Sequence, residues 1–428
     1  MKKKYRIILY TSIFLLCVVA SIILVVKKSN SVYEEESKPK VVKHKSMLSM
    51  NLEQTAGSGD YKTVTQSKWP TEGYKFNAEL SRCENGSTLS WDDTKKAVIV
   101  SGNLSDKCYV YFDIYQPTLA EYIKSQYTGT QGENNIYYHD SDLANGAGDN
   151  SYRYAGANPN NFVCFGTTES PCPTDNLYRI IGVFGENYHG VTGKQLVKLI
   201  KYDYMTTDEL GTDGDYSQTY KEWGMDSTYK GTYGDGERIG VYYWNYKATG
   251  SATNTWSTSL LNKTNLNTNF INNIGTTWAN KIATVTWKVG GNTWANIGTK
   301  TSSVAYTNEI TNPVTTNTTD NATTYSAKIG LMYVSDYGFA ASPDAWTLTM
   351  SSYNNTTATN NNWMYMGLYE WTISRYADYS STAFFVDIDG RVNYRLYYHY
   401  GVRASFNLES SVRYVSGSGS MSDPIVIN

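Results

Sequence analysis

With 428 residues, the chain exceeds the about 100 to 200 residues of one ordinary domain, so we expect two or three folded units. The formal net charge is −2, and the excess of Lys and Arg is confined to the start of the chain, which disfavours nucleic acid as a partner. Only 18% of the residues are charged, whereas 39 are tyrosines and 11 are tryptophans, a composition that argues against extensive disorder and is typical of extracellular recognition domains.

The chain begins with a candidate membrane anchor. An uninterrupted apolar stretch from Ile7 to Val26 has about the 20 residues that a helix needs to cross a bilayer. Basic residues precede it and acidic residues follow at Glu34–Glu36, so the N-terminus is expected in the cytoplasm and the rest outside the cell. A cleaved signal peptide is the alternative, but the apolar stretch continues past the possible cleavage site at Ala20. Residues 1–28 are therefore predicted to form a cytoplasmic tip and a single-pass anchor in the cell membrane.

The next segments are predicted to be a tether and a small module. Residues 29–65 are charged and lack a sustained apolar period, which is typical of a flexible tether. In residues 66–115, short apolar stretches alternate with turn residues such as Asn85-Gly86, which indicates a small antiparallel β module. A core of this size needs a covalent staple.

The cysteines beyond the apolar stretch are Cys83, Cys108, Cys164 and Cys172. Export makes them candidates for disulfides, and proximity in sequence favours Cys83 with Cys108 and Cys164 with Cys172. A zinc site is disfavoured because neither pair has Cys-x-x-Cys spacing. No metal and no cofactor are expected.

Residues 116–157 are predicted to form a short helix over Thr118–Tyr127 and then a linker rich in Gly, Asn and Asp. Residues 158–428 are predicted to form one large α+β domain. Its expected elements are a hairpin of Leu177–Phe184 and Leu196–Tyr202, helices within Trp256–Trp278, a strand at Ala327–Val334 followed by a helix capped by Ser335-Asp336, and a β-meander over Trp371–Arg375, Ala383–Asp387, Arg391–Tyr394 and Val402–Leu408.

Three segments of this domain carry a family resemblance. DNLYRIIGVF at 175–184, VKLIK at 197–201 and GVRASFNL at 401–408 resemble a family of anchored bacterial surface proteins. The C-terminal domain of that family is similar to the C-type-lectin-like fold of formylglycine-generating enzymes and of the variable proteins of diversity-generating retroelements. The resemblance covers residues 158–428 and implies a C-type-lectin-like ligand-binding domain there.

The residue types disfavour an enzyme. Formylglycine-generating enzymes use a late cysteine pair to hold copper, and no cysteine follows Cys172. The scattered His139, His189 and His399 belong to no hydrolase motif, and no carboxylate pair stands out. The segment Asp387–Asn393 lacks the ligand pattern of a calcium loop and is better explained by a hairpin turn at Asp389-Gly390. Calcium-dependent sugar motifs of Glu-Pro-Asn type are absent from the sequence.

The segment from Thr372 to Leu408 has the composition of a binding surface. It is rich in Tyr, Asn, Asp, Ser and Arg and contains no Lys, Glu, Gln, Met or Trp. Mutagenesis by a diversity-generating retroelement replaces adenines. If it acts on the first two bases of an AAY codon, which encodes Asn, none of those five missing residue types can arise. The alternative is that they are missing by chance, because the whole chain has few charged residues. The predicted ligand-binding residues are Tyr376, Asp378, Tyr379, Asp387, Asp389, Arg391, Tyr394, Arg395, Tyr397, Tyr398, His399 and Tyr400. If 397–400 is a sheet edge, alternate tyrosines there are core residues instead.

The sequence thus predicts a membrane-anchored receptor or adhesin that binds an extracellular protein or glycan. A structural module of the cell envelope and, less favoured, an extracytoplasmic enzyme are the alternatives.

Overall fold

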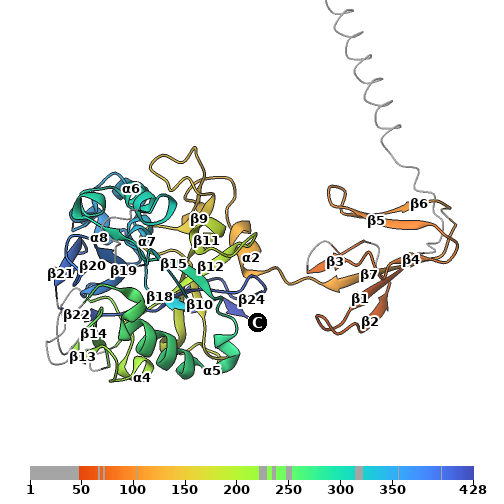
Figure 1. The fold of residues 1–428 in the computed structure, drawn as a ribbon. Helices are drawn as coiled ribbons and strands as arrows, with labels where there is room; N and C mark the ends of the chain where they lie inside the picture. Colours follow the sequence, from red (N-terminus) through yellow and green to blue (C-terminus); the bar gives the residue numbers. More distant parts are fainter. Residues whose placement is uncertain are drawn as a thin grey trace, which may run out of the picture. The chain divides into compact units, whose positions relative to one another are not determined.

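The computed structural model describes residues 48–65, 68–70, 73–103, 105–220, 229–233, 238–246, 253–313, 322–354, 356–396 and 398–428. The chain divides into two compact units, Met1–Tyr115 and Gln116–Asn428; the described residues of the first run from red to orange and those of the second from orange to blue (Figure 1). Both are built mainly from β-sheet, and helices in the larger unit make the fold a mixed α+β fold. The predicted anchor, 7–26, lies outside the described residues; within the described ranges, no helix is long and apolar enough to span a bilayer.

The smaller unit contains a five-stranded sheet and a separate hairpin. The sheet has the order β2-β1-β7-β3, with β4 also paired to β7. Its strands are β1 (Leu48–Glu53), β2 (Tyr61–Val64), β3 (Tyr74–Phe76), β4 (Arg82–Cys83) and β7 (Cys108–Ile114), and the hairpin consists of β5 (Thr88–Asp92) and β6 (Ala97–Ser101).

The smaller unit starts earlier than predicted. β1 and β2 lie within the segment 29–65 that was expected to be a flexible tether, and β1 pairs in parallel with β7. Met50 and Leu52 of β1 are buried against Val110 and Phe112 of β7. Met50 and Leu52 are two apart, which is enough to bury one face of a short strand. In the sequence they give only a weak strand pattern, because charged residues surround them. The tether prediction is therefore corrected from Leu48 onward.

Both predicted disulfides are present. Cys83 is bonded to Cys108, which joins β4 to β7 in the smaller unit. Cys164 is bonded to Cys172 in the larger unit, where it closes a short loop between β10 and β11.

The first sheet of the larger unit is antiparallel and has the order β18-β23-β12-β11-β9-β8, with β10 also paired to β11. Its strands are β8 (Ile136–His139), β9 (Ser151–Tyr154), β10 (Phe162–Cys164), β11 (Leu177–Phe184), β12 (Leu196–Lys201), β18 (Ile329–Gly330) and β23 (Ser405–Asn407). The predicted hairpin is confirmed as β11 and β12, which are buried on both faces.

The second sheet has the order β13-β14-β22-β19-β20-β21, with β16 also paired to β19. Its strands are β13 (Tyr216–Thr219), β14 (Gly240–Tyr243), β16 (Gly291–Asn292), β19 (Glu370–Tyr376), β20 (Thr382–Val386), β21 (Val392–Leu396) and β22 (His399–Gly401). Two small antiparallel pairs complete the β structure: β15 (Val285–Lys288) with β17 (Thr324–Ala327), and β24 (Tyr414–Ser416) with β25 (Val426–Ile427).

Short helices cover these sheets. The α-helices are α2 (Leu119–Ser125), α3 (Glu186–His189), α4 (Thr207–Leu210), α5 (Ile271–Ala279), α6 (Ser302–Tyr306), α7 (Val334–Ala340) and α8 (Thr356–Asn360), and the π-helical segments are η6 (Leu261–Phe270) and η8 (Thr307–Thr311). Single 3₁₀ turns lie at Glu133–Asn135, Thr174–Asn176, Trp256–Thr258, Trp294–Asn296, Pro343–Ala345 and Met350–Ser352. The predicted helices within Trp256–Trp278 are confirmed as η6 and α5.

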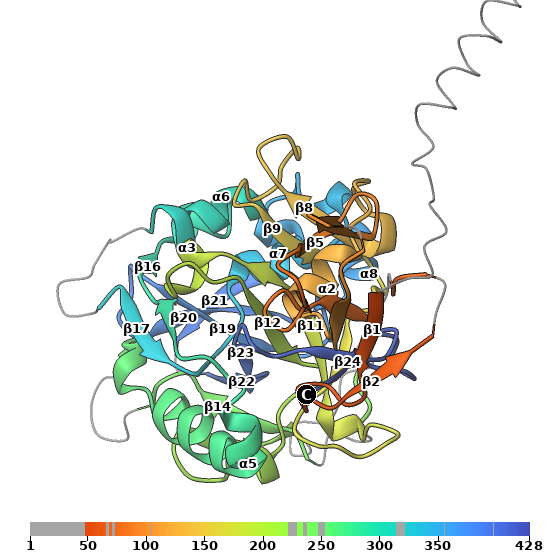
Figure 2. The same ribbon diagram turned by 90° about the vertical axis from the view of Figure 1, so that its right-hand side faces the viewer.

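The segment 116–157 is not a linker but part of the larger unit. Its predicted helix is confirmed as α2, which begins with a capping box between Thr118 and Glu121 and lies beside β11 and β12 in both ribbon views (Figure 1, Figure 2). The passage rich in Gly, Asn and Asp supplies turns around β8 and β9, where Asn145 and Asn150 take positive φ angles of 59° and 57°. Turns with a left-handed backbone favour Asn and Gly, and flexible linkers are rich in the same residues, so the composition of this passage did not distinguish ordered turns from a linker.

The strand predicted over Ala327–Val334 is shorter than expected. Ala327 ends β17, Ile329–Gly330 form β18, and α7 begins at Val334, where the backbone N–H of Tyr333 donates to the Asp336 carboxylate (3.0 Å). The β-meander is confirmed for β19, β20 and β21. The last strand predicted for the meander, Val402–Leu408, instead contains β23, which belongs to the first sheet and pairs there with β12 and β18.

Candidate ligand-binding surface

The predicted binding residues lie around the hairpin of β20 and β21. The predicted turn at Asp389-Gly390 joins these strands, with Gly390 at a φ of 90° and its N–H donating to the Asp387 carbonyl oxygen (2.9 Å). Asp387 is itself buried: it accepts the Asp389 N–H (2.8 Å) and pairs with Arg391 Nε (2.5 Å). Asp387 therefore holds the turn together and does not face a ligand, which corrects its predicted role.

The register of the hairpin divides the predicted residues between two faces. Ala383 pairs with Arg395, and Phe384 pairs with Tyr394. Because successive side chains of a strand point to opposite faces, Tyr394 and Arg395 cannot belong to one surface. The single predicted surface therefore separates into two groups of residues, and Tyr397 lies outside the described residues.

The first group is a stack of four rings, Tyr379, Tyr376, Tyr394 and Trp294, which we call the ring stack. The Tyr376 ring lies 5.9 Å from Tyr379 and 4.3 Å from Tyr394, and Trp294 meets Tyr394 edge to face at 5.3 Å. Tyr379 is 55% exposed, whereas Tyr376 is only 4% exposed. Burial, and then the hydrogen bond with Asp378, raises the pKa of the Tyr376 hydroxyl. Tyr376 is a core residue, which corrects its predicted role, while Tyr379 and Asp378 remain exposed beside it.

The second group follows the end of β22 and is joined by contacts between neighbouring rings. Tyr246 stacks on Tyr243 (4.4 Å), Tyr243 meets His399 edge to face (5.2 Å), and His399 lies 6.4 Å from Tyr398. The guanidinium of Arg395 lies 5.0 Å from the Tyr398 ring centroid. We call Tyr243, Tyr246, Arg395, Tyr398 and His399 the aromatic strip.

The outer members of the aromatic strip are open to solvent. Tyr246 and Tyr398 are each 43% exposed, and Arg395 is exposed as well. Partial burial lowers the pKa of His399, so its ring is neutral at physiological pH. The strip therefore presents neutral rings with a single cation, which is a chemistry suited to large amphipathic contacts.

Tyr400 lies beneath the strip and is not part of its surface. It is 3% exposed and contacts Tyr398, Phe385, Tyr369 and Trp371 at ring distances of 5.9, 4.6, 5.0 and 4.6 Å. Its predicted role as a binding residue is corrected. Simple alternation along 397–400 does not explain why Tyr398 is exposed and Tyr400 is packed, because residues two apart on a strand share a face; Tyr398 lies before β22, whereas Tyr400 lies within it.

A buried ion pair fixes the strands below the strip. Arg403 donates from Nε and Nη2 to the two oxygens of Glu370 (2.8 and 2.9 Å), and Nη2 also donates to the Met364 carbonyl oxygen (2.6 Å). Burial raises the pKa of Glu370, and the charge of Arg403 opposes that effect. The pair connects β19 to the chain that leaves β22, so Arg403 of the GVRASFNL segment is a structural residue here.

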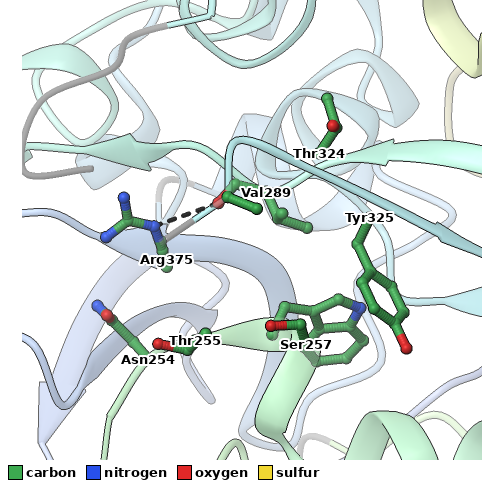
Figure 3. A pocket seen from close by; sticks show the side chains of 9 residues that line it. Asn254, Thr255, Ser257, Val289, Thr324, Tyr325 and Arg375 are labelled. Carbon is green, nitrogen blue, oxygen red and sulfur yellow. Dashed lines mark hydrogen bonds between the residues drawn. The ribbon is translucent and has the colours of Figure 1, made fainter. Parts of the chain in front are cut away.

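A small cavity near the ring stack is lined by Arg375, Asn254 and Val289 among others, and the guanidinium Nε donates to the Val289 carbonyl oxygen (3.2 Å; Figure 3). Its space of about 10 Å³ holds one water molecule rather than a ligand. The amide of Asn254 donates to the carbonyl oxygens of Tyr376, Tyr379 and Thr382, so it fixes the turn between β19 and β20.

Sequence reasoning missed Tyr243, Tyr246 and Trp294. Tyr243 and Tyr246 flank Trp244 in a short aromatic segment that could have been noticed, but only the pairing of β14 with β22 brings them to His399. Trp294 gave no signal, because it lies on a 3₁₀ turn and not on a strand.

Within the described part of the chain, no group of three or more His, Cys, Asp or Glu side chains could hold a metal ion. Comparisons of the chain with protein-family models, curated proteins and solved structures find no match, so the family resemblance rests on its sequence motifs alone.

Proposed function

We propose that this chain is a membrane-anchored surface receptor or adhesin whose larger unit binds an extracellular protein or glycan through the aromatic strip. The observation that carries the proposal is the contact between exposed Tyr398, exposed Arg395 and the rings of His399, Tyr243 and Tyr246.

The physical reason is the cost of leaving such rings in water. Two exposed rings joined by two half-buried rings on a folded unit are unusual unless a partner covers them. A tyrosine gives a large contact area with few rotatable bonds and a hydroxyl for pairing, and Arg and Tyr are over-represented among the residues that dominate binding energy. These groups offer contact area and hydrogen bonds rather than a nucleophile, so binding is favoured over catalysis.

The proposal includes a C-type-lectin-like fold for the larger unit and an anchor at 7–26. The segments that carry the family resemblance support the first part, because they become neighbouring strands: β11 pairs with β12, and β12 pairs with β23. The positive charge before the apolar stretch supports the second part. Diversification of the segment 372–408 by a retroelement belongs to the proposal as well.

The test is to probe protein and glycan arrays with the purified chain and then to repeat the positive hits with Tyr398→Ala and Tyr246→Ala variants. Loss of binding with unchanged folding supports the proposal. If neither variant changes any interaction, the rings are structural and the chain is an envelope module.

Cell fractionation tests the anchor. The protein is expected in the membrane fraction with its C-terminus open to external protease, and a soluble shortened form as the main species contradicts this.

A further inference from the structure

A sealed pair of a lysine and an aspartate lies between β12 and α7. Lys198 Nζ is 2.7 Å from Asp336 Oδ2, and neither side chain is exposed to solvent. The residues come from distant parts of the chain, 138 positions apart. An amine and a carboxyl group held in contact inside a dry core are the two reactants of an amide bond.

A phenol touches both reactants. The Tyr188 hydroxyl lies 2.7 Å from Asp336 Oδ1 and 2.9 Å from Oδ2, and it accepts a hydrogen bond from Lys198 Nζ (2.7 Å). Burial, and then the charge of Asp336, raises the pKa of Tyr188, so the phenol stays protonated and can pass a proton between the amine and the carboxyl group.

A cation also lies near the carboxyl group. Arg153 Nη1 is 3.8 Å from Asp336 Oδ1, and among the described residues this nitrogen has no hydrogen-bond partner. Nη2 of the same guanidinium pairs with Asp149 (2.8 Å). Nη1 is therefore positioned to stabilise negative charge that develops on Oδ1.

The surroundings exclude water from the amine. Lys198 Nζ lies 4.5 Å from the ring centroid of Tyr333 and 4.9 Å from those of Tyr188 and Trp287. Burial lowers the pKa of Lys198, which makes its neutral, nucleophilic form more accessible. The Glu309 carboxyl group accepts hydrogen bonds from the backbone N–H groups of Val334 and Ser335 at the start of α7, and burial raises its pKa.

From this geometry we propose that Lys198 and Asp336 condense to an intramolecular amide that links β12 to α7 covalently. The ammonium group first gives one proton to the carboxylate through Tyr188, which leaves an amine and a carboxylic acid. The nitrogen lone pair then forms a bond to Asp336 Cγ, and the negative oxygen of the tetrahedral intermediate lies toward Arg153. The Cγ–OH bond breaks, the second nitrogen proton passes through Tyr188 to the departing hydroxyl, and one water molecule leaves. No oxidant or other reactant is needed.

A second lysine on the same strand provides an internal control. Lys201 Nζ lies 2.8 Å from Glu209 Oε1, but Glu209 is partly exposed, and its other oxygen accepts from the N–H and hydroxyl of Thr206. Because solvent reaches that carboxylate and Thr206 already donates to it, Lys201 is expected to keep an unmodified side-chain amine.

The test is a trypsin digest of the purified full-length chain, reduced and alkylated, followed by mass spectrometry. Trypsin cuts after lysine and arginine but not after an acylated lysine. The amide predicts that segment 195–201 stays uncut at Lys198, is cut after Lys201, and is joined to segment 329–375 with the loss of one water molecule. If Lys198 is cut and the two segments are recovered separately, the pair is only an ion pair and the proposal is overturned.

Two variants separate chemistry from folding. Lys198→Arg keeps the positive charge but cannot form this amide, so the joined segments should disappear. Tyr188→Phe keeps the ring in the core and removes the hydroxyl, so at matched times after synthesis the joined fraction should form roughly a hundredfold more slowly. An unchanged rate of joining in Tyr188→Phe overturns the proton-transfer role assigned to Tyr188.

Discussion

The Tyr376 ring lies parallel to the Tyr394 ring, with centroids 4.3 Å apart and planes at 2°. Tyr376 is packed inside the ring stack, while its neighbour Tyr379, three residues later, covers the outer end. Two tyrosines of the same segment thus have different roles, and substitution can distinguish them.

Tyr376→Ala is expected to lower the free energy of unfolding of the larger unit by about 3 to 5 kcal/mol, because it removes a buried ring from a packed core. Tyr379→Ala, which removes a mostly exposed ring, is expected to cost less than about 1 kcal/mol. Denaturant titration of both variants measures the difference. Equal losses would mean that the stack is not ordered as described.

Tyr398→Ala is expected to weaken binding to any ligand of the aromatic strip by more than about 1 kcal/mol, since Tyr398 is the exposed ring beside Arg395. Tyr379→Ala is the matched control, because it also removes an exposed tyrosine but from the ring stack. Affinity and melting temperature should be measured together. A control variant that loses as much affinity as Tyr398→Ala would place the ligand elsewhere.

The buried pair of Glu370 and Arg403 should give a non-additive pair of substitutions. Glu370→Leu leaves an unpaired guanidinium in the core and is expected to destabilise the larger unit by about 3 to 5 kcal/mol. The double variant with Arg403→Met removes both charges and should cost less than Glu370→Leu alone. A double-mutant cycle of unfolding free energies checks this, and simple additivity would argue that the two groups are not in contact.

Removal of the Cys164–Cys172 disulfide should destabilise the larger unit by about 2 to 3 kcal/mol, because the bond restricts a short loop in the unfolded chain. The comparison is the Cys164→Ser, Cys172→Ser double variant against the wild type, with the Cys83–Cys108 bond intact in both. Peptide mapping without reduction should find both pairs linked in the wild type, and free thiols at 164 and 172 in exported protein would contradict the structure.

His139 should make the larger unit less stable at mildly acidic pH. Burial, and then the charge of Arg153, lowers its pKa well below the usual value of 6.5, so the folded state holds the ring neutral while the unfolded state takes up a proton. Its contribution is fully present above about pH 6.5 and falls by up to about 1.4 kcal/mol per pH unit below that. Unfolding free energies at pH 7.5, 6 and 5 should show the loss, and His139→Asn should flatten the slope. An equal slope in that variant would assign the effect to other groups.

The sequence by itself determined the elements whose pattern is local. The apolar stretches at 177–184 and 196–202 predicted the central hairpin, the capping residues Thr118 and Glu121 lie at the start of a predicted helix, and Asp389-Gly390 predicted a tight turn. The spacing of the cysteines was enough to predict both disulfides, since each pair is close in sequence. These features depend on neighbouring residues, which is why sequence patterns identify them.

Only the tertiary structure decided which tyrosines are exposed. Both faces of β19 and β20 are buried, so alternation along the chain does not distinguish a core ring from a surface ring. The residues that end the ring stack beside Tyr394 and extend the strip beside His399, Trp294 and Tyr243, come from distant parts of the chain. The contact of Lys198 with Asp336 has the same origin, because the distance between two side chains far apart in sequence is set by the packing of the whole unit.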